Sequence, residues 1–181
     1  MEKEQELVQS AQNGNLAAFE ALVKNHSPAL YRFIYRLVSD PVDAEELTQE
    51  TWVRAWQALS RFKRQSSFKT WLFKIGMNLA FNLRKRRKAT ERLNELMLAS
   101  TQDEPVEAFQ QKRREEVVKA TLAKLPPDQR TALVLAIYEG LSYKEIAEVM
   151  GKSVRAVDGL LVRAKTNLRQ ILTPARRQGL I

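Results

Sequence analysis

Apolar residues recur at steps of three and four along most of this chain, and that spacing is typical of amphipathic helices. It predicts a short first helix that ends at Asn13-Gly14, where Gly accepts a left-handed cap. Asn15 is expected to cap a second helix, and Pro28 fits the first turn of a third. Their inward faces consist of Leu16, Phe19, Leu22 and Val23, and then of Leu30, Phe33, Ile34, Leu37 and Val38.

A longer helix is expected to begin at Asp40-Pro41, because Asp caps helices and Pro fits the first helical position. Its apolar stripe consists of Trp52, Ala55, Trp56 and Leu59. Strands would require apolar and polar residues to alternate between turn residues, and no stretch has that pattern. The predicted fold class is therefore all-α.

Residues 61–88 are the most basic stretch of the chain, with ten Lys or Arg and no acid. One helix face is apolar and consists of Leu72, Ile75, Leu79 and Leu83. The neighbouring face carries Lys74, Asn78, Phe81 and Lys85. Cations beside exposed rings suit single-stranded nucleic acid, because cations follow phosphates and rings stack on unpaired bases. The stretch alone leaves two interpretations open. It could hold melted DNA together with the loop from Lys63 to Ser67, or it could be a core helix with a solvated basic face.

Residues 99–108 read ASTQDEPVEA, and a small, polar, acidic composition with Pro is typical of a linker. The charge pattern changes at the same place. We therefore predict two small helical domains, over residues 1–95 and 112–175, joined by a flexible linker over residues 96–111. The length of the linker is expected to leave the two domains free to move.

The second half predicts helices over residues 109–125 and 128–138, followed by a helix-turn-helix, with an ordinary helical hairpin as the alternative. Ser142 to Glu145 form a capping box, and Ser153 caps a last helix that is expected to stop before Pro174. A steep crossing of two helices needs a small residue and a turn residue, which Ala147 and Gly151 provide. The wedge between these helices is filled by Ile146, Met150, Val157 and Leu160.

A helix-turn-helix that reads DNA places its second helix in the major groove, with the N-terminal end first. Arg can pair with guanine and Asp can accept from cytosine, whereas contacts to phosphate position the protein without reading sequence. The solvent-side positions near that end are Arg155, Asp158, Gly159, Val162 and Arg163. The phosphate candidates are Lys144, Lys152, Ser153 and Arg163.

Asp43, Glu46 and Glu50 share one face of the helix that begins at Asp40, with Glu45 beside them. They could form a solvated face near a helix N-terminus, where acids are favourable. They could bind a divalent cation, although that needs oxygens from several elements. They could also dock on a basic partner surface. The residues alone place the solvated face ahead of docking and the metal site last.

The net charge of +9 is unevenly distributed along the chain. Residues 1–60 hold five bases and nine acids, residues 61–92 hold eleven and one, and residues 126–181 hold nine and five. Two basic zones suggest two contacts with one polyanion and leave the acidic zone for another partner. The chain has no Cys, which is compatible with a reducing cytoplasm. It shows neither a signal peptide nor a membrane-spanning run, so a cytoplasmic protein without membrane insertion is expected.

Three motifs, in this order, resemble the bacterial extracytoplasmic-function (ECF) sigma factors of the sigma-70 family. DAEELTQETWVRAWQAL (43–59) is similar to the family's segment that binds core RNA polymerase. FKTWLFKIGMNLAFNLRKRRK (68–88) is similar to its promoter-melting and −10-reading segment. In the family both segments belong to the domain known as region 2, which the resemblance places over residues 1–95. LPPDQRTALVLAIYEGLSYKEIAEVMGKSVRAVDGLLVRAK (125–165) is similar to its −35-reading domain, known as region 4. The resemblance covers about residues 1–95 and 112–172.

The resemblance implies a role for each candidate residue, and none of these roles is catalytic. Polymerase binding falls to Asp43, Glu45, Glu46, Leu47, Gln49 and Glu50. Contact with the −10 element and the melted strand falls to Lys63, Arg64, Gln65, Ser66, Ser67, Lys74, Asn78, Arg84, Lys85, Arg87 and Lys88, with Trp71 supporting the base pocket from the core side. Contact with the −35 element falls to Lys144, Lys152, Ser153, Arg155, Asp158, Gly159, Val162 and Arg163.

The chain departs from the family pattern at two places that contact DNA. Asp158-Gly159 stand where many members have Arg-Ser, and Arg64-Gln65 stand where Gly-Asp or Gly-Glu is common. The resemblance therefore does not supply the promoter sequence. It does imply core RNA polymerase and promoter DNA as partners, an anti-sigma factor as a further partner, and no cofactor or metal.

Two rival functions are kept beside this interpretation. A stand-alone transcriptional regulator would use the same helix-turn-helix, but it would need a dimer interface or an effector pocket. A metal-dependent nuclease would use Asp43, Glu46 and Glu50 beside the basic helix. Association with core polymerase separates the first rival from a sigma factor, and divalent-dependent DNA cleavage separates the second.

Overall fold

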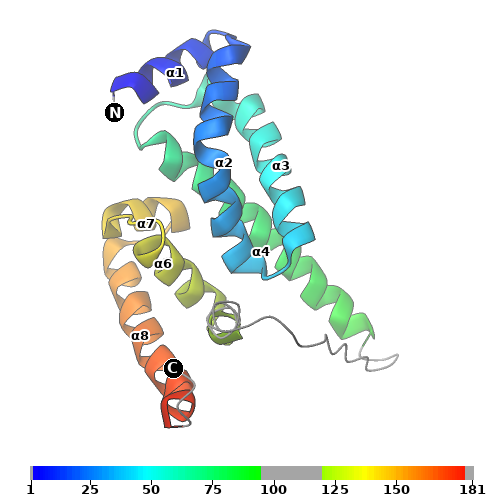
Figure 1. Cartoon of the computed structure of the whole chain (residues 1–181), viewed down its shortest axis with the longest axis vertical. Coiled ribbons are helices and arrows are strands. Elements are labelled where there is room, and N and C mark those ends of the chain that lie inside the picture. Colours follow the sequence, from blue (N-terminus) through cyan, green and yellow to red (C-terminus); the bar gives the residue numbers. More distant parts are fainter. Residues whose placement is uncertain (1, 95–119, 178–181) are drawn as a thin grey trace.

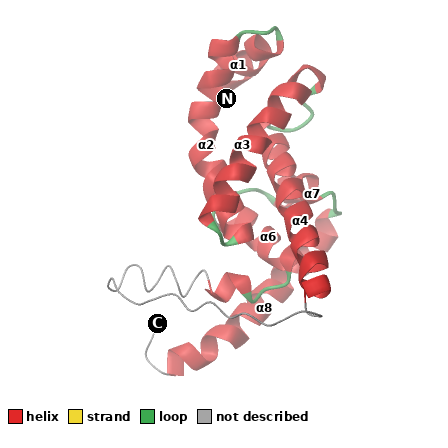
Figure 2. Ribbon diagram, turned by 90° about the vertical axis from the view of Figure 1, so that its right-hand side faces the viewer, coloured by secondary structure: helices red, strands yellow, loops and turns green. Residues whose placement is uncertain are grey.

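The structure is a computed structural model that describes residues 2–94 and 120–177. Within these ranges every regular element is a helix (Figures 1 and 2). The elements are α1 (Glu2–Gln12), α2 (Leu16–Val38), α3 (Pro41–Ala58), the 3-10 turn η1 (Leu59–Arg61), α4 (Phe68–Asn94), α6 (Pro127–Ile137), α7 (Tyr143–Met150) and α8 (Val154–Arg177). The prediction of an all-α fold is confirmed. The predicted linker and most of the predicted helix over residues 109–125 lie outside the described residues.

Helix α2 is one continuous helix where the sequence predicted two. Asn15 caps it as expected, since its side chain accepts from the backbone N–H of Ala18 at 3.2 Å. Pro28 lies inside the helix although Pro removes a backbone donor there. Leu22 and Leu30, on either side of Pro28, are both fully buried. Burial on both sides outweighs the lost hydrogen bond, so the prediction that a new helix begins at Pro28 was wrong.

Helix α1 fixes the chain segment that leads from η1 into the loop before α4. The Gln12 side chain donates to the carbonyl oxygens of Leu59 at 3.0 Å and Phe62 at 2.8 Å. Nε2 of His26 lies 2.8 Å from Oε1 of Glu4, which ties the start of α1 to α2. The loop over residues 63–67 therefore starts from a fixed position.

Helix α4 lies at the centre of the molecule, against α2 and α3 and also against α7 (Figure 1). Phe73 is fully buried and stacks on Phe33 with ring centroids 4.8 Å apart. A Cβ atom at Gly76 would stand only 3.2 Å from Cδ1 of Leu30 and of Ile34, so Gly permits this close approach. Burial extends beyond the apolar face that the sequence indicated, because α7 covers another side of the helix.

The helix-turn-helix of α7 and α8 has the local geometry that the sequence predicted. Oγ of Ser142 accepts from the backbone N–H of Glu145, and Oε2 of Glu145 accepts from the backbone N–H of Ser142 at 2.8 Å. The Ser142 hydroxyl also donates to Oε2 of Glu145 at 2.7 Å. This hydrogen bond first, and then the one from the Ser142 backbone N–H, holds the pKa of the Glu145 carboxyl below its usual value. Gly151 ends α7 in the left-handed conformation, with φ 62° and ψ 36°. The wedge residues Ile146, Met150, Val157 and Leu160 are all buried.

The last helix differs from the prediction at its end. Helix α8 continues to Arg177 and so passes Pro174, where the sequence predicted a stop. Pro removes one backbone hydrogen bond at this position without ending the helix. Over residues 2–94 and 120–177, no helix combines the length and hydrophobicity needed to cross a membrane.

Candidate functional site

The outer side of α3 carries an acidic surface whose members come from one helix. Glu45, Glu46, Gln49 and Glu50 are exposed, and Leu47 is half-buried. Oε1 of Glu50 accepts from Nε of Arg54 at 2.7 Å, one helical turn away. We call Glu45, Glu46, Gln49 and Glu50 the acidic face of α3.

Asp43 lies apart from the acidic face, although the sequence grouped it there. The residue is only 8% exposed, and its carboxylate is held by Arg87 of α4. Nη2 of Arg87 donates to Oδ1 of Asp43 at 2.7 Å, and Nη1 lies 2.6 Å from Oδ2. Two residues that were assigned to different partners, polymerase and DNA, thus bind each other and join the start of α3 to the basic end of α4.

Sequence reasoning missed three exposed apolar residues that extend the acidic face. Val42 is 63% exposed, Val53 is 51% exposed and Trp56 is 41% exposed. With Glu46 and Gln49 between them, they follow the helical period along one side of α3. Trp56 was predicted to face the core, yet only part of its ring is covered, by Phe19 at 4.7 Å between centroids. The sequence contained one signal that could have identified these residues. The spacing of Val42 and Val53 places them on the same side of the helix as Glu46 and Gln49.

The loop before α4 presents polar side chains over an aromatic base. Lys63, Arg64 and Gln65 are exposed, and Ser66 is half-buried. Ser67 begins α4 by accepting from the backbone N–H of Thr70 at 3.1 Å. Beneath the loop, the rings of Phe62 and Trp71 stack with centroids 4.7 Å apart. Trp71 is half-buried and packs against the core.

Arg64 is one of two non-Gly residues with a left-handed backbone among the described residues, with φ 54°. A left-handed conformation costs a residue with a Cβ atom about 1 kcal/mol or more. The loop therefore keeps a backbone shape that favours Gly while presenting a cation.

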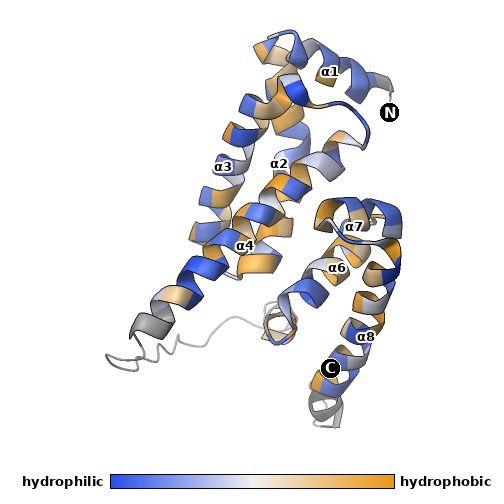
Figure 3. Cartoon of the chain, turned by 180° about the vertical axis from the view of Figure 1, so that it is seen from behind, coloured by the Kyte–Doolittle hydropathy of each residue, from blue (hydrophilic) through white to orange (hydrophobic). Residues whose placement is uncertain are grey.

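The C-terminal half of α4 is largely hydrophilic (Figure 3), and its sequence there is rich in Lys and Arg. Lys74, Asn78, Arg84, Lys85, Arg87 and Lys88 are exposed. Phe81 departs from the expected pattern, because it is half-buried and lines a small cavity with Leu37 and Arg130. The prediction that Phe81 stands among the exposed cations was wrong, since α6 covers its side of α4.

The second helix of the helix-turn-helix presents its predicted reading positions to solvent. Arg155, Asp158, Val162 and Arg163 are exposed, and Gly159 is half-buried. Lys144 and Ser153 are exposed as well, and Oγ of Ser153 accepts from the backbone N–H of Ala156 at 3.2 Å. Nζ of Lys152 lies 3.1 Å from Oδ2 of Asp128, so this cation has an acidic neighbour in α6.

The carboxylates of α3 do not converge on a common point. Asp43 is turned to Arg87 and Glu50 to Arg54, so the nuclease hypothesis has no paired carboxylates to hold a cation. In the part of the chain that the structure describes, no group of three His, Cys, Asp or Glu side chains is arranged to hold a metal ion. The arrangement provides charged surfaces for partners.

Comparisons with known proteins decide between the remaining hypotheses. The family model for sigma-70 region 2 matches residues 22–90, and the model for sigma-70 region 4 matches residues 115–168. The chain is 32% identical to the RNA polymerase sigma-H factor of Pseudomonas aeruginosa, over 98% of both chains. This chain belongs to the sigma-70 family of RNA polymerase sigma factors. Within that family it is an ECF sigma factor.

Solved structures of sigma factors share this fold. CnrH, in its complex with the cytosolic domain of CnrY, matches with a TM-score of 0.72 and 32% identity, over 94% of this chain and 97% of that chain. The sigma factor RpoE of Bartonella quintana, in complex with the anti-sigma factor NepR, matches with a TM-score of 0.68 and 28% identity, over 85% and 96%.

Family membership establishes the general function of this sigma factor. It binds core RNA polymerase and directs it to promoters, and it is not an enzyme. The comparisons give no support to the stand-alone regulator. We call residues 2–94 region 2 and residues 120–177 region 4.

Proposed function

We propose that three surfaces of this sigma factor divide the work of promoter recognition. The acidic face of α3, extended by Val42 and Val53, docks on core RNA polymerase. The loop over residues 63–67 and the solvent side of α4 hold the melted −10 element, and the N-terminal end of α8 reads the −35 element. The supporting observation is that all three surfaces are exposed in one chain and differ in charge, with acids on α3 and cations on α4 and α8.

Docking through the acidic face combines attraction with apolar burial. Complementary charge steers encounter and fixes orientation, whereas buried apolar side chains at the centre of an interface contribute most of the affinity. Val53 and Trp56 are exposed apolar residues next to the acids, so a partner that covers them removes apolar area from water. Asp43 supports this surface from within by holding Arg87.

Melted DNA is held by the loop and by Asn78 opposite it on α4. Polar side chains at Gln65 and Ser66 can read an unstacked base, and Lys74 can follow the phosphates. The stacked rings of Phe62 and Trp71 hold the loop in position when DNA is bound. Arg64 adds a cation at the outer side of the loop.

Reading of the −35 element falls to the exposed side of α8. Arg155 and Asp158 are one helical turn apart, which suits contacts with neighbouring base pairs in the major groove. Lys144 and Arg163 are placed to contact phosphates on either side. The Asp158-Gly159 pair gives this factor its own preference, because Asp accepts where Arg would donate.

The free factor is expected to bind DNA weakly. A stacked base returns about 1–3 kcal/mol, while unpairing costs a few kcal/mol, so region 2 alone gains little from melting. Docked on polymerase, the two DNA contacts gain effective concentration from each other. Nanomolar sequence-specific binding at physiological salt without polymerase would contradict this division of work.

We extend two further properties to this chain from its relatives. It acts in the cytoplasm, where bacterial core RNA polymerase is found, and an anti-sigma factor restrains it. The second point is supported by the solved complex of RpoE with an anti-sigma factor. Co-expression with a candidate anti-sigma factor should abolish the association with core polymerase.

Charge reversal on α3 tests the docking assignment. Glu46→Lys should weaken association with core polymerase at least tenfold, because a cation replaces an acid within the acidic face. Glu6→Lys makes the same change at an exposed position of α1 and should leave association unchanged. Co-purification over a range of salt concentrations measures both variants. Equal binding of the two variants would refute the docking surface.

Run-off transcription with added core polymerase tests the two DNA surfaces separately. Asn78→Ala should slow promoter opening more than closed-complex formation, and Asp158→Ala should change the preferred −35 sequence without affecting opening. If neither substitution changes either step, the assignment of these residues to DNA is wrong.

A further inference from the structure

One ion pair joins the helix assigned to polymerase to the helix assigned to DNA. Nη2 of Arg87 in α4 donates to Oδ1 of Asp43 in α3, and Nη1 of the same guanidinium lies close to Oδ2. Both terminal nitrogens therefore face the carboxylate. We call Asp43 and Arg87 the α3–α4 ion pair. The family resemblance assigns its two members to different partners outside the chain.

The acid of the α3–α4 ion pair has a fixed position. Oδ1 of Asp40 accepts from the backbone N–H of Asp43 at 2.9 Å, which caps the first turn of α3. The side chain of Asp43 is only 10% exposed. Its Oδ2 has no aligned hydrogen-bond donor among the described residues, so this oxygen depends on the charge of Arg87. A covered carboxylate without a cation is costly, and Asp43 is therefore expected to keep Arg87 when phosphates are near.

Arg87 lies on a different side of α4 from the proposed DNA contacts. Lys85 is seven residues beyond Asn78, which is about two helical turns, so these two share one side of the helix. Arg87 is nine residues beyond Asn78, which is about two and a half turns, so it projects from the opposite side. The helical period and the contact with Asp43 agree that Arg87 is directed to α3.

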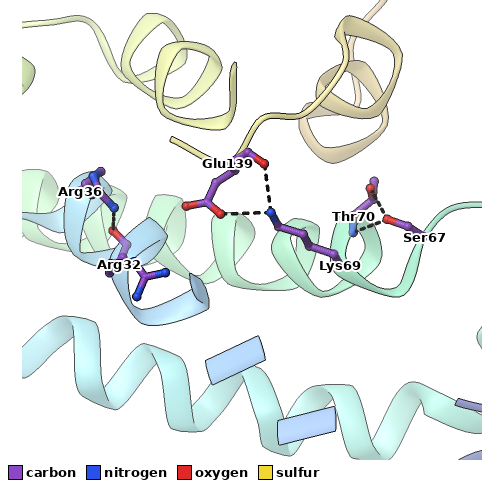
Figure 4. Close-up of polar contacts among 6 residues, drawn as sticks. All are labelled: Arg32, Arg36, Ser67, Lys69, Thr70 and Glu139. Carbon is purple, nitrogen blue, oxygen red and sulfur yellow. Dashed lines mark hydrogen bonds and ion pairs between the residues drawn. The ribbon is translucent and has the colours of Figure 1, made fainter. Parts of the chain in front are cut away.

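A second cation on that side of α4 is also held within the chain. Lys69 precedes Arg87 by eighteen residues, about five turns, so the two share a side. Nζ of Lys69 donates to the carbonyl oxygen of Glu139 at 3.0 Å and lies 3.2 Å from its Oε2 (Figure 4). The cations opposite Asn78 thus bind acids of the chain, whereas Lys74 and Lys85 on its own side are exposed.

The α3–α4 ion pair lies where the apolar packing of α4 has ended. Leu83 is half-buried, and residues 84–90 are all exposed. Apolar contacts therefore fix the direction of α4 up to Leu83. The cations that follow, Lys85 among them, are held against α3 by the contact between Arg87 and Asp43.

We propose that the α3–α4 ion pair is a positioning pair. It fixes the basic end of α4 relative to α3, so that a factor docked on polymerase through α3 presents Lys85 to the −10 element, and neither Asp43 nor Arg87 contacts polymerase or DNA. This inference rests on the proposed assignment of α3 to polymerase and of α4 to the −10 element.

Single substitutions break the pair from either side. Asp43→Asn and Arg87→Gln each leave one charge without its partner, so each should slow promoter opening on core polymerase about threefold to tenfold. The reactivity of unpaired thymines toward permanganate, followed over time, measures opening. Simple electrostatics predicts the opposite sign for Asp43→Asn, because the loss of an acid favours DNA binding. Faster opening by Asp43→Asn would overturn the proposal.

Two controls accompany these variants. Glu20→Gln removes an acid at an exposed position of α2 and should leave the rate of opening unchanged. Association of Asp43→Asn with core polymerase should stay within about twofold of the unmodified chain, because Asn keeps the size of the side chain and the carboxylate is covered. Retained association also shows that the variant is folded. A loss as large as that expected for Glu46→Lys would make Asp43 a polymerase contact and would overturn the proposal.

The double variant separates a positioning pair from a direct phosphate contact. Asp43→Asn combined with Arg87→Gln leaves no unpaired charge, and an uncharged replacement of a buried ion pair is often neutral. Opening by the double variant should therefore recover to within about twofold of the unmodified chain. If Arg87 instead binds a phosphate, the double variant stays as slow as Arg87→Gln alone, and the proposal is wrong.

Salt dependence counts phosphate contacts. Forked DNA that carries the −10 element is bound by the factor on core polymerase, and the logarithm of affinity is plotted against the logarithm of salt concentration. Lys85→Gln should lower the slope by about 0.7–0.9, the value of one phosphate contact, and Arg87→Gln should leave it unchanged. Equal losses would overturn the positioning role. An unchanged slope for Lys85→Gln would overturn the proposed DNA surface of α4, while recovery by the double variant would still decide whether Asp43 and Arg87 act as a pair.

Discussion

Region 4 and region 2 obtain their functional surfaces in different ways. In region 4 the position of α8 is set by residues close in sequence: a capping box at Ser142, a left-handed Gly151 and an apolar wedge between two adjacent helices. In region 2 the surfaces depend on helices distant in sequence. Arg87 reaches Asp43, and Gln12 reaches the carbonyl of Phe62.

This comparison shows where sequence patterns are sufficient to predict which side of a helix is exposed. Local capping and turn rules determine which side of α8 faces water, because the apolar wedge residues pack on its other side. On α4 the exposed side depends on what packs against it, and part of that packing comes from region 4. Substitutions that remove a single local contact or a single long-range contact should therefore change the free energy of unfolding of one region more than that of the other. All three tryptophans, Trp52, Trp56 and Trp71, lie in region 2, so tryptophan fluorescence reports this region selectively.

The largest effect is expected at the aromatic core of region 2. Phe73→Ala removes a fully buried ring that stacks on Phe33, and such truncations lower the free energy of unfolding by about 3–5 kcal/mol. Urea denaturation followed by tryptophan fluorescence should show this loss. The far-UV circular dichroism signal of region 4 should be affected less, since the wedge residues Ile146, Met150, Val157 and Leu160 are buried between its own helices. A loss below about 1 kcal/mol would contradict the central role of Phe73.

Two helical glycines, one in each region, sharpen the comparison. Gly76→Val should lower the free energy of unfolding of region 2 by about 1–3 kcal/mol, because Leu30 and Ile34 crowd the new side chain. Gly159→Ala should raise that of region 4 by about 0.5–1 kcal/mol, since its nearest neighbour is the end of Arg163 at 3.8 Å. Thermal denaturation measures both variants. Equal effects of the two substitutions would contradict the difference in packing.

The capping box tests the local control of region 4. Ser142→Ala should lower the free energy of unfolding by about 1 kcal/mol, because the N–H of Glu145 loses its acceptor. The pKa of Glu145 is lowered in the folded state, so its contribution is present above the ordinary carboxyl range and is lost as the pH falls through the lowered pKa. Glu145→Gln should flatten this acid dependence. Circular dichroism melts between neutral and acidic pH would detect it, and an unchanged slope would exclude this role.

The smallest effect on stability is expected at the acidic face. Glu50→Ala breaks an exposed pair with Arg54 that is worth about 0.3–0.5 kcal/mol, so unfolding should hardly change. Association with core polymerase should nevertheless weaken several-fold if this face docks. Matching denaturation curves combined with weaker co-purification would separate function from folding. A loss of stability above about 1 kcal/mol would assign Glu50 to the fold instead.

Much of the fold could be predicted from sequence, and the misses have a common physical cause. The helices and their caps at Asn15, Asp40 and Ser142 follow from local rules. Pro28 was assigned a helix start because that rule ignores how much apolar area lies on both sides. Asp43 and Phe81 were placed on surfaces because periodicity identifies a face but not its neighbour. Neither the local capping rules nor the apolar periodicity predicted that region 4 packs on region 2.

The hydrogen bonds of Gln12 have a practical consequence for anyone who trims this chain. The match to the family model begins at residue 22, so α1 looks dispensable by that measure. Yet removal of α1 would deprive the carbonyl groups of Leu59 and Phe62 of their amide donor just before the loop over residues 63–67. A chain that lacks α1 should therefore still bind core polymerase but open promoters more slowly.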